Sequence, residues 1–316
     1  MRSVVTGGFG YLGGRLARFL AGQAGHDIVL GSRRPVAPPP WLPGAQVMPT
    51  PWDSPAGLEK ICDGADAVFH LAGMNAQDCV ADRVMAMEVN AVATARLVRA
   101  AVRRGVKRFI YLSTAHVYGS PLAGVITEKT CPVSLHPYAF SHRAGEDTVR
   151  TAHERGEIEG AVIRLSNAYG APVHKDANCW MLLVNDLCRQ AVTTQRMVLN
   201  SSGRQRRDFI ALTDACRAIH HLLEIPAGQL GDGLFNVGGA WAPTILEMTE
   251  RVAARMAAVT GRKPEISRKA DQGTENHESL DYKIAKLTGT GFNLGGEDTL
   301  DRELDGLIEF CLRSAG

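Results

Sequence analysis

The sequence predicts an α/β fold with a doubly wound parallel sheet, followed by a smaller α/β lobe in the C-terminal part of the chain. In the first half, short apolar segments alternate with longer helical patterns. This alternation implies βαβ units, and therefore a parallel sheet with helices on both faces. The first apolar segment, residues 3–5, also runs directly into a glycine-rich turn and then a helical pattern.

The glycines after the first apolar segment predict a dinucleotide site. Gly7, Gly10 and Gly13 form a GxxGxxG pattern between a strand and a helix. Glycine permits positive φ and lets a pyrophosphate approach bare backbone, and the helix N-terminus offers free N–H groups and partial positive charge. The pattern is typical of a Rossmann domain, whose bound dinucleotide carries the redox chemistry. The alternative is a glycine-rich turn in another kind of α/β protein.

The expected elements also suggest how the chain divides. Strands are expected at residues 3–5, 28–30, 67–70, 108–112, 160–164 and 234–237, and helices at 84–104, 138–154, 245–259 and 300–312. Loops are expected at the proline-rich residues 35–51 and at 171–178 and 200–206. We expect a dinucleotide-binding domain at 1–165, with a contribution from about 207–235, and a mainly substrate-binding lobe at 166–316. That lobe is expected over the carboxyl ends of the parallel strands, where doubly wound folds bind ligands.

Composition excludes several classes of function. The net charge of +2 over 316 residues indicates no nucleic-acid footprint. No apolar run is long enough to span a membrane. The seven cysteines are scattered without a CxxC pair, which fits a reducing compartment and argues against disulfides or a metal site. The first strand leaves no room for a signal peptide, so a cytoplasmic protein is expected.

Four further segments place small or polar residues where the expected strands end or the expected helices begin. Small residues follow the strand at 67–70, which suits a backbone passing close to a flat cofactor. Hydroxyl groups end the strand at 108–112, and a tyrosine lies near the start of the helix at 138–154. The segments read HLAG at 70–73, EVNA at 88–91, YLSTAHVYG at 111–119 and HPYAFSHRAGE at 136–146.

In this order the motifs resemble the extended short-chain dehydrogenase/reductase superfamily and its nucleotide-sugar epimerase/dehydratase group. The resemblance continues through RLSNAYG at 164–170, GRQRRDFI at 203–210 and FNVG at 235–238, and so covers nearly the whole chain. It implies that Tyr138 is a general acid/base at a substrate hydroxyl or carbonyl and that Thr114 orients the same oxygen. The cofactor contacts that it implies are Gly7, Phe9, Gly10, Tyr11, Leu12, Gly13, Leu71, Ala72, Gly73, Asn90, Tyr138 and His142.

The chain departs from the family four residues after Tyr138, where His142 replaces a lysine. In the family that lysine lowers the pKa of the tyrosine and binds the cofactor ribose. Three interpretations stay open. A protonated His142 substitutes for the lysine, which predicts unusually strong activity below neutral pH; Arg143 or another cation supplies the charge; or the protein is a non-catalytic NADP(H)-binding sensor.

The end of the second strand bears on the choice of dinucleotide. An acidic residue there normally binds the ribose 2′-hydroxyl of NAD, whereas this chain has Ser32, Arg33 and Arg34. These residues suit a 2′-phosphate, so NADP(H) is expected, with NAD(H) as the alternative. The resemblance also implies that Asp53 contacts the adenine amino group, and the alternative is that it caps the next helix.

The resemblance leaves two reaction types open, an epimerase and a ketoreductase. Dehydratases of the family carry acidic residues where this chain has Ala115 and His116, which argues against a dehydratase. His116 is a candidate additional proton donor near the substrate.

The expected substrate is a nucleotide-sugar, because Asn167 and Arg207 match family positions that contact the diphosphate. A small sugar acid or another carbonyl compound stays open, since Ser201 and Ser202 replace the usual glycine and acidic residue. The helices at 84–104 and 138–154 imply a homodimer by the same resemblance.

Overall fold

The computed structural model describes residues 1–270 and 278–315 of the chain. These residues form two compact units. The first comprises Met1–Gly119, Cys131–Leu165 and Cys216–Asn236, and the second comprises Ser120–Thr130, Ser166–Ala215 and Val237–Gly316.

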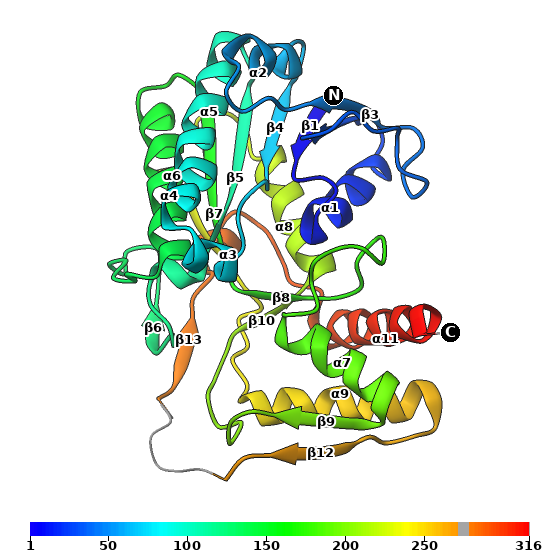
Figure 1. Cartoon of the computed structure of the whole chain (residues 1–316). Helices are drawn as coiled ribbons and strands as arrows, with labels where there is room; N and C mark the ends of the chain where they lie inside the picture. Colours follow the sequence, from blue (N-terminus) through cyan, green and yellow to red (C-terminus); the bar gives the residue numbers. More distant parts are fainter. Residues whose placement is uncertain (271–277, 316) are drawn as a thin grey trace. The chain divides into compact units, whose positions relative to one another are not determined.

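The elements follow one another along the chain as coloured in Figure 1. The strands are β1 (Arg2–Thr6), β2 (Asp27–Ser32), β3 (Gln46–Pro49), β4 (Ala67–His70), β5 (Arg108–Thr114), β6 (Gly124–Ile126), β7 (Glu159–Leu165), β8 (Asn167–Tyr169), β9 (Arg196–Leu199), β10 (Phe209–Ala211), β11 (Leu234–Val237), β12 (Glu265–Arg268) and β13 (Leu280–Tyr282). The helices are α1 (Tyr11–Ala21), α2 (Pro55–Cys62), α3 (Ala76–Ala81), α4 (Arg83–Met87), η1 (Glu88–Val92), α5 (Ala93–Arg103), η2 (Ala115–Val117), α6 (Pro137–Glu154), α7 (Leu183–Thr194), α8 (Leu212–Glu224), α9 (Ile245–Thr260), α10 (Ala285–Thr288) and α11 (Gly296–Ala315).

The first unit is built around a seven-stranded sheet with the strand order β11-β7-β5-β4-β1-β2-β3. All pairings from β3 through to β7 are parallel. In the register, Val5 of β1 lies opposite Leu30 of β2 and Phe69 of β4. The chain order reverses between β1 and β4, and doubly wound folds bind ligands at such a switch point. The predicted fold class is therefore confirmed.

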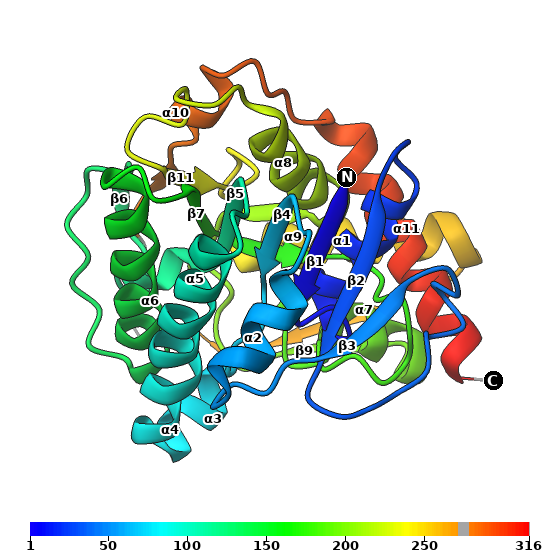
Figure 2. The same ribbon diagram turned by 90° about the horizontal axis from the view of Figure 1, so that it is seen from above.

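Apolar side chains on both faces of the strands explain why this sheet is central. Val4, Val68 and Phe109 are fully buried, and they share a core cluster with Leu97 of α5 and Val149 of α6. Figure 2 shows α2, α5 and α6 along one face of the sheet. The apolar positions of α5 and α6 repeat at helical spacing, so each helix buries one stripe against the strands.

The second unit has its own core. Helices α7, α9 and α11 enclose a cluster that includes Leu187, Val252 and Leu307, all of them buried. Three short parallel pairs, β8 with β10, β9 with β12 and β6 with β13, complete this part of the fold. Helix α9 begins with a capping box between Thr244 and Glu247, which satisfies two N-terminal N–H groups.

Two local expectations were wrong. The stretch 35–51 is not all loop, because β3 pairs in parallel with β2 at the edge of the sheet. Its proline is the last strand residue, where a missing N–H is tolerated. The segment 84–104 is not one α-helix, because a π-helical turn, η1, separates α4 from α5. Single π turns of this kind occur frequently at functional sites.

The described residues contain neither a membrane-spanning helix nor a metal-binding cluster. No helix there is both long enough and apolar enough to cross a membrane. No group of three or more His, Cys, Asp and Glu side chains there is arranged to hold a metal ion.

Candidate active site

The turn after β1 packs backbone against backbone. Gly7 has a φ of +71°, and a Cβ atom there would lie 2.7 Å from the backbone of both Leu71 and Ala72. A Cβ atom at Gly13 would lie 2.1 Å from the carbonyl oxygen of Gly7. Side chains at these two positions are therefore excluded, and the turn is held directly against the segment that follows β4.

The N-terminus of α1 suits an anion. Gly10 is the N-cap residue, no side chain caps the helix, and the first turn contains no acidic residue. The first N–H groups of a helix have no partner within the helix and attract negative charge. Tyr11 and Leu12 open this helix, and Phe9 stands edge-on to Trp41 just before it. Bare glycine backbone and an uncapped helix together fit the pyrophosphate of a dinucleotide.

The residues at the end of β2 are partly engaged with one another. The Ser32 hydroxyl donates to the Arg34 carbonyl at 2.7 Å and accepts from the Arg34 N–H at 3.2 Å. Arg33 and Arg34 are exposed. The Ser32 hydroxyl is thus already hydrogen-bonded within this turn, whereas the side chains of Arg33 and Arg34 are exposed to solvent.

Asp53 forms an ion pair with Arg96 at 2.6 Å. It does not cap the next helix, because Ser54 is the N-cap residue of α2 and accepts from the Gly57 N–H at 3.1 Å. The alternative role of Asp53 as a helix cap is therefore wrong.

Three of the expected residues meet at the carboxyl end of β5. Thr114 ends the strand, and Tyr138 lies in the first turn of α6, close enough for the Thr114 hydroxyl to lower the pKa of the Tyr138 phenol. The ring of His116 stands edge-on to that of Tyr138, with centroids 6.4 Å apart. Desolvation raises the pKa of Tyr138 above its ordinary value of 10, and the influence of Thr114 only partly opposes this rise.

His142 lies one helical turn beyond Tyr138, and its ring centroid is 4.6 Å from that of Tyr138. The His142 side chain is buried, and burial lowers its pKa from 6.5 to about 4. The imidazole is therefore neutral at pH 7. The lowered pKa counts against the interpretation in which a protonated His142 supplies the missing lysine charge, and with it against strongest activity below neutral pH.

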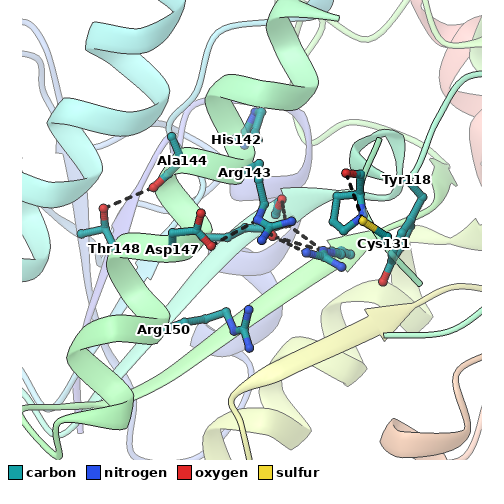
Figure 3. Close-up of polar contacts among 12 residues, drawn as sticks. Tyr118, Cys131, His142, Arg143, Ala144, Asp147, Thr148 and Arg150 are labelled. Atoms are coloured by element: carbon teal, nitrogen blue, oxygen red, sulfur yellow. Dashed lines mark hydrogen bonds and ion pairs between the residues drawn. The ribbon is translucent and has the colours of Figure 1, made fainter. Parts of the chain in front are cut away.

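Arg143 does not supply that charge either. Its Nε lies 3.2 Å from Asp147 Oδ1 and 3.8 Å from Glu146 Oε2, so it pairs with carboxylates of its own helix. Figure 3 shows Arg143 directed toward Asp147, with His142 lying away from this pair.

Asn90, in the π-helical turn η1, connects the loop after β4 to α6. Its Oδ1 accepts from the Met74 N–H at 2.8 Å, and its Nδ2 donates to Ser141 Oγ at 2.9 Å. A Cβ atom at Gly73 would lie 3.4 Å from His142 Cε1, so bare backbone adjoins the His142 ring.

A buried ion pair joins β7 to α6 and was not predicted from the sequence. Arg164 of β7 and Glu146 of α6 are almost fully buried and approach to 2.6 Å. The Ser113 hydroxyl donates to Glu146 Oε1 at 2.5 Å, and the Arg164 guanidinium lies 4.7 Å from the centre of the Tyr118 ring. The one signal in the sequence was an arginine inside the apolar run at 160–165.

Asn167 and Arg207 belong to the second unit. The Asn167 side chain donates to the backbone carbonyl of Asp208 at 2.9 Å. Arg207 is half-buried, its Nη2 donates to Gln205 at 3.3 Å, and burial lowers its pKa below the ordinary value. Among the described residues it has no carboxylate partner.

Comparison with known proteins gives consistent results. The model of the NAD dependent epimerase/dehydratase family matches residues 3–238. A dTDP-glucose 4,6-dehydratase of Streptomyces niveus is 26% identical over 265 residues, which is 80% of this chain and 76% of the relative. A second protein of that name, from an Actinoplanes strain, is 34% identical over 63% of this chain and 60% of its own length.

Two solved structures have the same fold as this chain. The UDP-glucose 4-epimerase of Thermotoga maritima, solved with UDP-glucose, has a TM-score of 0.82 at 20% identity over the whole of both chains. MoeE5, solved with UDP-glucuronic acid and NAD, has a TM-score of 0.80 at 24% identity over 99% of this chain and 100% of its own.

The buried ion pair generates a stability prediction. Glu146→Gln leaves the Arg164 charge buried without its partner, so the free energy of unfolding should fall by about 3–5 kcal/mol. Asp147→Asn, on the same helix but in an exposed pair, should cost less than about 1 kcal/mol. Urea denaturation of both variants measures the difference, and equal losses would contradict the argument.

The buried histidines predict a loss of stability in acid. Burial lowers the pKa of His142 to about 4 and that of His70 to about 3. The unfolded chain takes up these protons near pH 6.5, whereas the folded chain excludes them. The free energy of unfolding is therefore highest above pH 6.5 and falls as the pH decreases toward 4. His142→Gln should flatten this fall by about 3 kcal/mol, measured by denaturant titration at several pH values. An unchanged slope would count against a neutral His142.

Proposed function

Because the chain belongs to the NAD dependent epimerase/dehydratase family, we propose that it is an epimerase that oxidises and re-reduces a hydroxyl-bearing carbon of a nucleotide-sugar. One observation carries this proposal: Thr114 and Tyr138 adjoin at the carboxyl end of β5, close enough for the Thr114 hydroxyl to lower the pKa of the Tyr138 phenol. The anion-binding turn after β1 and this pair belong to the same unit.

The residues around Thr114 favour an epimerase over a dehydratase. The turn η2 that follows it reads Ala115, His116 and Val117, without a carboxylate to exchange a proton during water elimination. The curated dehydratase relatives support the substrate class and not this step.

We assign the proton transfer to Tyr138. When bound, the dinucleotide accepts a hydride from the sugar carbon and returns it. The Tyr138 phenolate takes the hydroxyl proton as that carbon is oxidised, and the phenol returns the proton when the carbonyl is reduced. Thr114 donates a hydrogen bond that orients the same oxygen. The raised pKa of Tyr138 favours the donor form at neutral pH, so oxidation is the more demanding half of the cycle.

NAD(H) is the cofactor that we assign. The family description and the ligand of the solved MoeE5 structure support this choice. The NADP(H) expected from the end of β2 has only the exposed guanidinium groups of Arg33 and Arg34 in its favour, since the Ser32 hydroxyl bonds the Arg34 backbone.

We assign the nucleotide-sugar diphosphate to Arg207, assisted by Asn167. A half-buried guanidinium that has no carboxylate partner among the described residues suits a bidentate phosphate contact. UDP and dTDP sugars fit this assignment, because relatives and structural neighbours are named for them.

A dinucleotide-binding sensor without turnover is the second candidate function. The observation in its favour is the pairing of a neutral His142 with a Tyr138 of raised pKa, which weakens the base. His142→Lys separates the two functions. A large gain in turnover would indicate a decayed enzyme site, whereas a loss would show that histidine is the adapted residue.

We propose that the protein forms a homodimer. Val80, Val84 and Met85 expose apolar side chains on α3 and α4, and these helices pack against α6. The resemblance of the helices at 84–104 and 138–154 to a dimer-forming pair in the family supports this assignment. Light scattering of the purified protein would test the assignment, and a monomer at micromolar concentration would contradict it.

The first experiment identifies the cofactor and the reaction. The purified protein should release NAD(H) on denaturation and should convert UDP-glucose or dTDP-glucose to an epimer detectable by NMR, with no net redox change. Tyr138→Phe should lower the rate by about 10²–10⁴-fold while the dinucleotide stays bound. Release of NADPH, or oxidation of added NADPH by keto-sugars, would indicate a ketoreductase and overturn the epimerase assignment.

The pH profile tests the state of Tyr138. A neutral His142 does not lower the pKa of the phenol, so the rate of sugar oxidation should keep rising through about pH 9. His142→Lys adds a positive charge and should move this rise to lower pH. A wild-type maximum below neutral pH would contradict the neutral assignment.

A further inference from the structure

Tyr111 is a buried residue that the proposed chemistry does not use. It lies in β5 and is 1% exposed. Its Oη lies 3.0 Å from His142 Nδ1 and 3.2 Å from the backbone carbonyl oxygen of Asn90. The hydroxyl carries a single proton, so these two acceptors compete for it with the more distant His142 carbonyl oxygen at 3.5 Å.

The surroundings of Asn90 favour His142 as the acceptor. Thr94 Oγ1 donates its only proton to the Asn90 carbonyl at 2.7 Å. That carbonyl therefore already has a closer donor. Thr94 Oγ1 is left as an acceptor toward His70 Nε2, which lies 3.0 Å away. Since His142 is neutral, one of its two ring nitrogens must accept.

The other ring nitrogen of His142 adjoins bare backbone. A Cβ atom at Gly73 would lie 3.6 Å from His142 Nε2, on the segment that follows β4. A lysine has three N–H donors and needs no particular tautomer, whereas a neutral histidine presents a donor at Nε2 in only one of its two tautomers.

We propose that Tyr111 is a positioning residue, which donates its hydroxyl proton to His142 Nδ1 and so holds His142 as the neutral Nε2–H tautomer. His142 then offers a fixed N–H donor to the dinucleotide ribose in place of the family lysine. This inference rests on the proposed dinucleotide site. Gly145 keeps the space open, because a Cβ atom there would lie 2.5 Å from Tyr111 Oη and 2.6 Å from the Asn90 carbonyl oxygen.

The first test observes the tautomer in the purified protein with its dinucleotide. ¹⁵N NMR of histidine-labelled protein should show a protonated Nε2 and a bare Nδ1 for His142, assigned with His142→Gln. In Tyr111→Phe this pattern should be lost. Tyr118→Phe is the matched control, since it also removes a buried hydroxyl, one that donates to Asn236 at 2.7 Å, and it should leave the pattern intact. A protonated Nδ1 in the wild type would overturn the proposal.

The second test is a double-mutant cycle on dinucleotide binding. Tyr111→Phe should weaken NAD binding about tenfold when residue 142 is histidine, because an unfixed tautomer loses one hydrogen bond. In the His142→Lys background the same change should have less than about a twofold effect, since lysine needs no tautomer. Equal losses in both backgrounds would show a merely structural role for Tyr111. Neither readout requires turnover, so failure of the epimerase assay leaves both tests valid.

Discussion

The candidate site depends on the hydrogen bonds of Asn90, whose side chain is 1% exposed. Its amide holds the loop after β4 through Met74 and holds α6 through Ser141, while its own carbonyl accepts from Thr94. A buried amide must find partners on both sides. Because Met74 and Ser141 lie on two separate segments, this requirement fixes the distance between the glycine backbone beside β4 and the helix that carries Tyr138.

Histidine in place of the family lysine changes the electrostatics of α6 near Tyr138. A lysine would bring a positive charge that stabilises a phenolate. His142 is enclosed by Tyr111, Gly73 and Tyr138, and burial keeps it neutral. Compared with a lysine, the neutral His142 therefore retains a hydrogen-bond donor but provides no positive charge. A neutral group costs less to bury than an ammonium, which fits an enclosure with no carboxylate among these contacts.

Local signals explain what could be predicted from the sequence. The strand at 67–70 and the turn at Gly7 were identifiable because alternation, apolar runs and glycine spacing reflect neighbours along the chain. The state of His142 was not predictable, because its enclosure comes from Tyr111, 31 residues away. The burial of Glu146 was missed for the same reason, since its partner lies on β7, 18 residues along the chain. Edge strand β3 was missed because it lies in a proline-rich stretch, 35–51, and prolines usually indicate a loop.

The π-helical turn at Glu88–Val92 has an evolutionary consequence. A turn closed by i→i+5 bonds holds one residue more than an α-helical turn, so it is equivalent to a single-residue insertion within a helix. In a regular α-helix, one inserted residue would rotate all later positions by about 100° around the helix axis. Homologous chains that lack the insertion would need a one-residue gap between Glu88 and Val92 for Leu97 to align with its counterparts. An alignment without that gap would assign the apolar face of α5 to solvent.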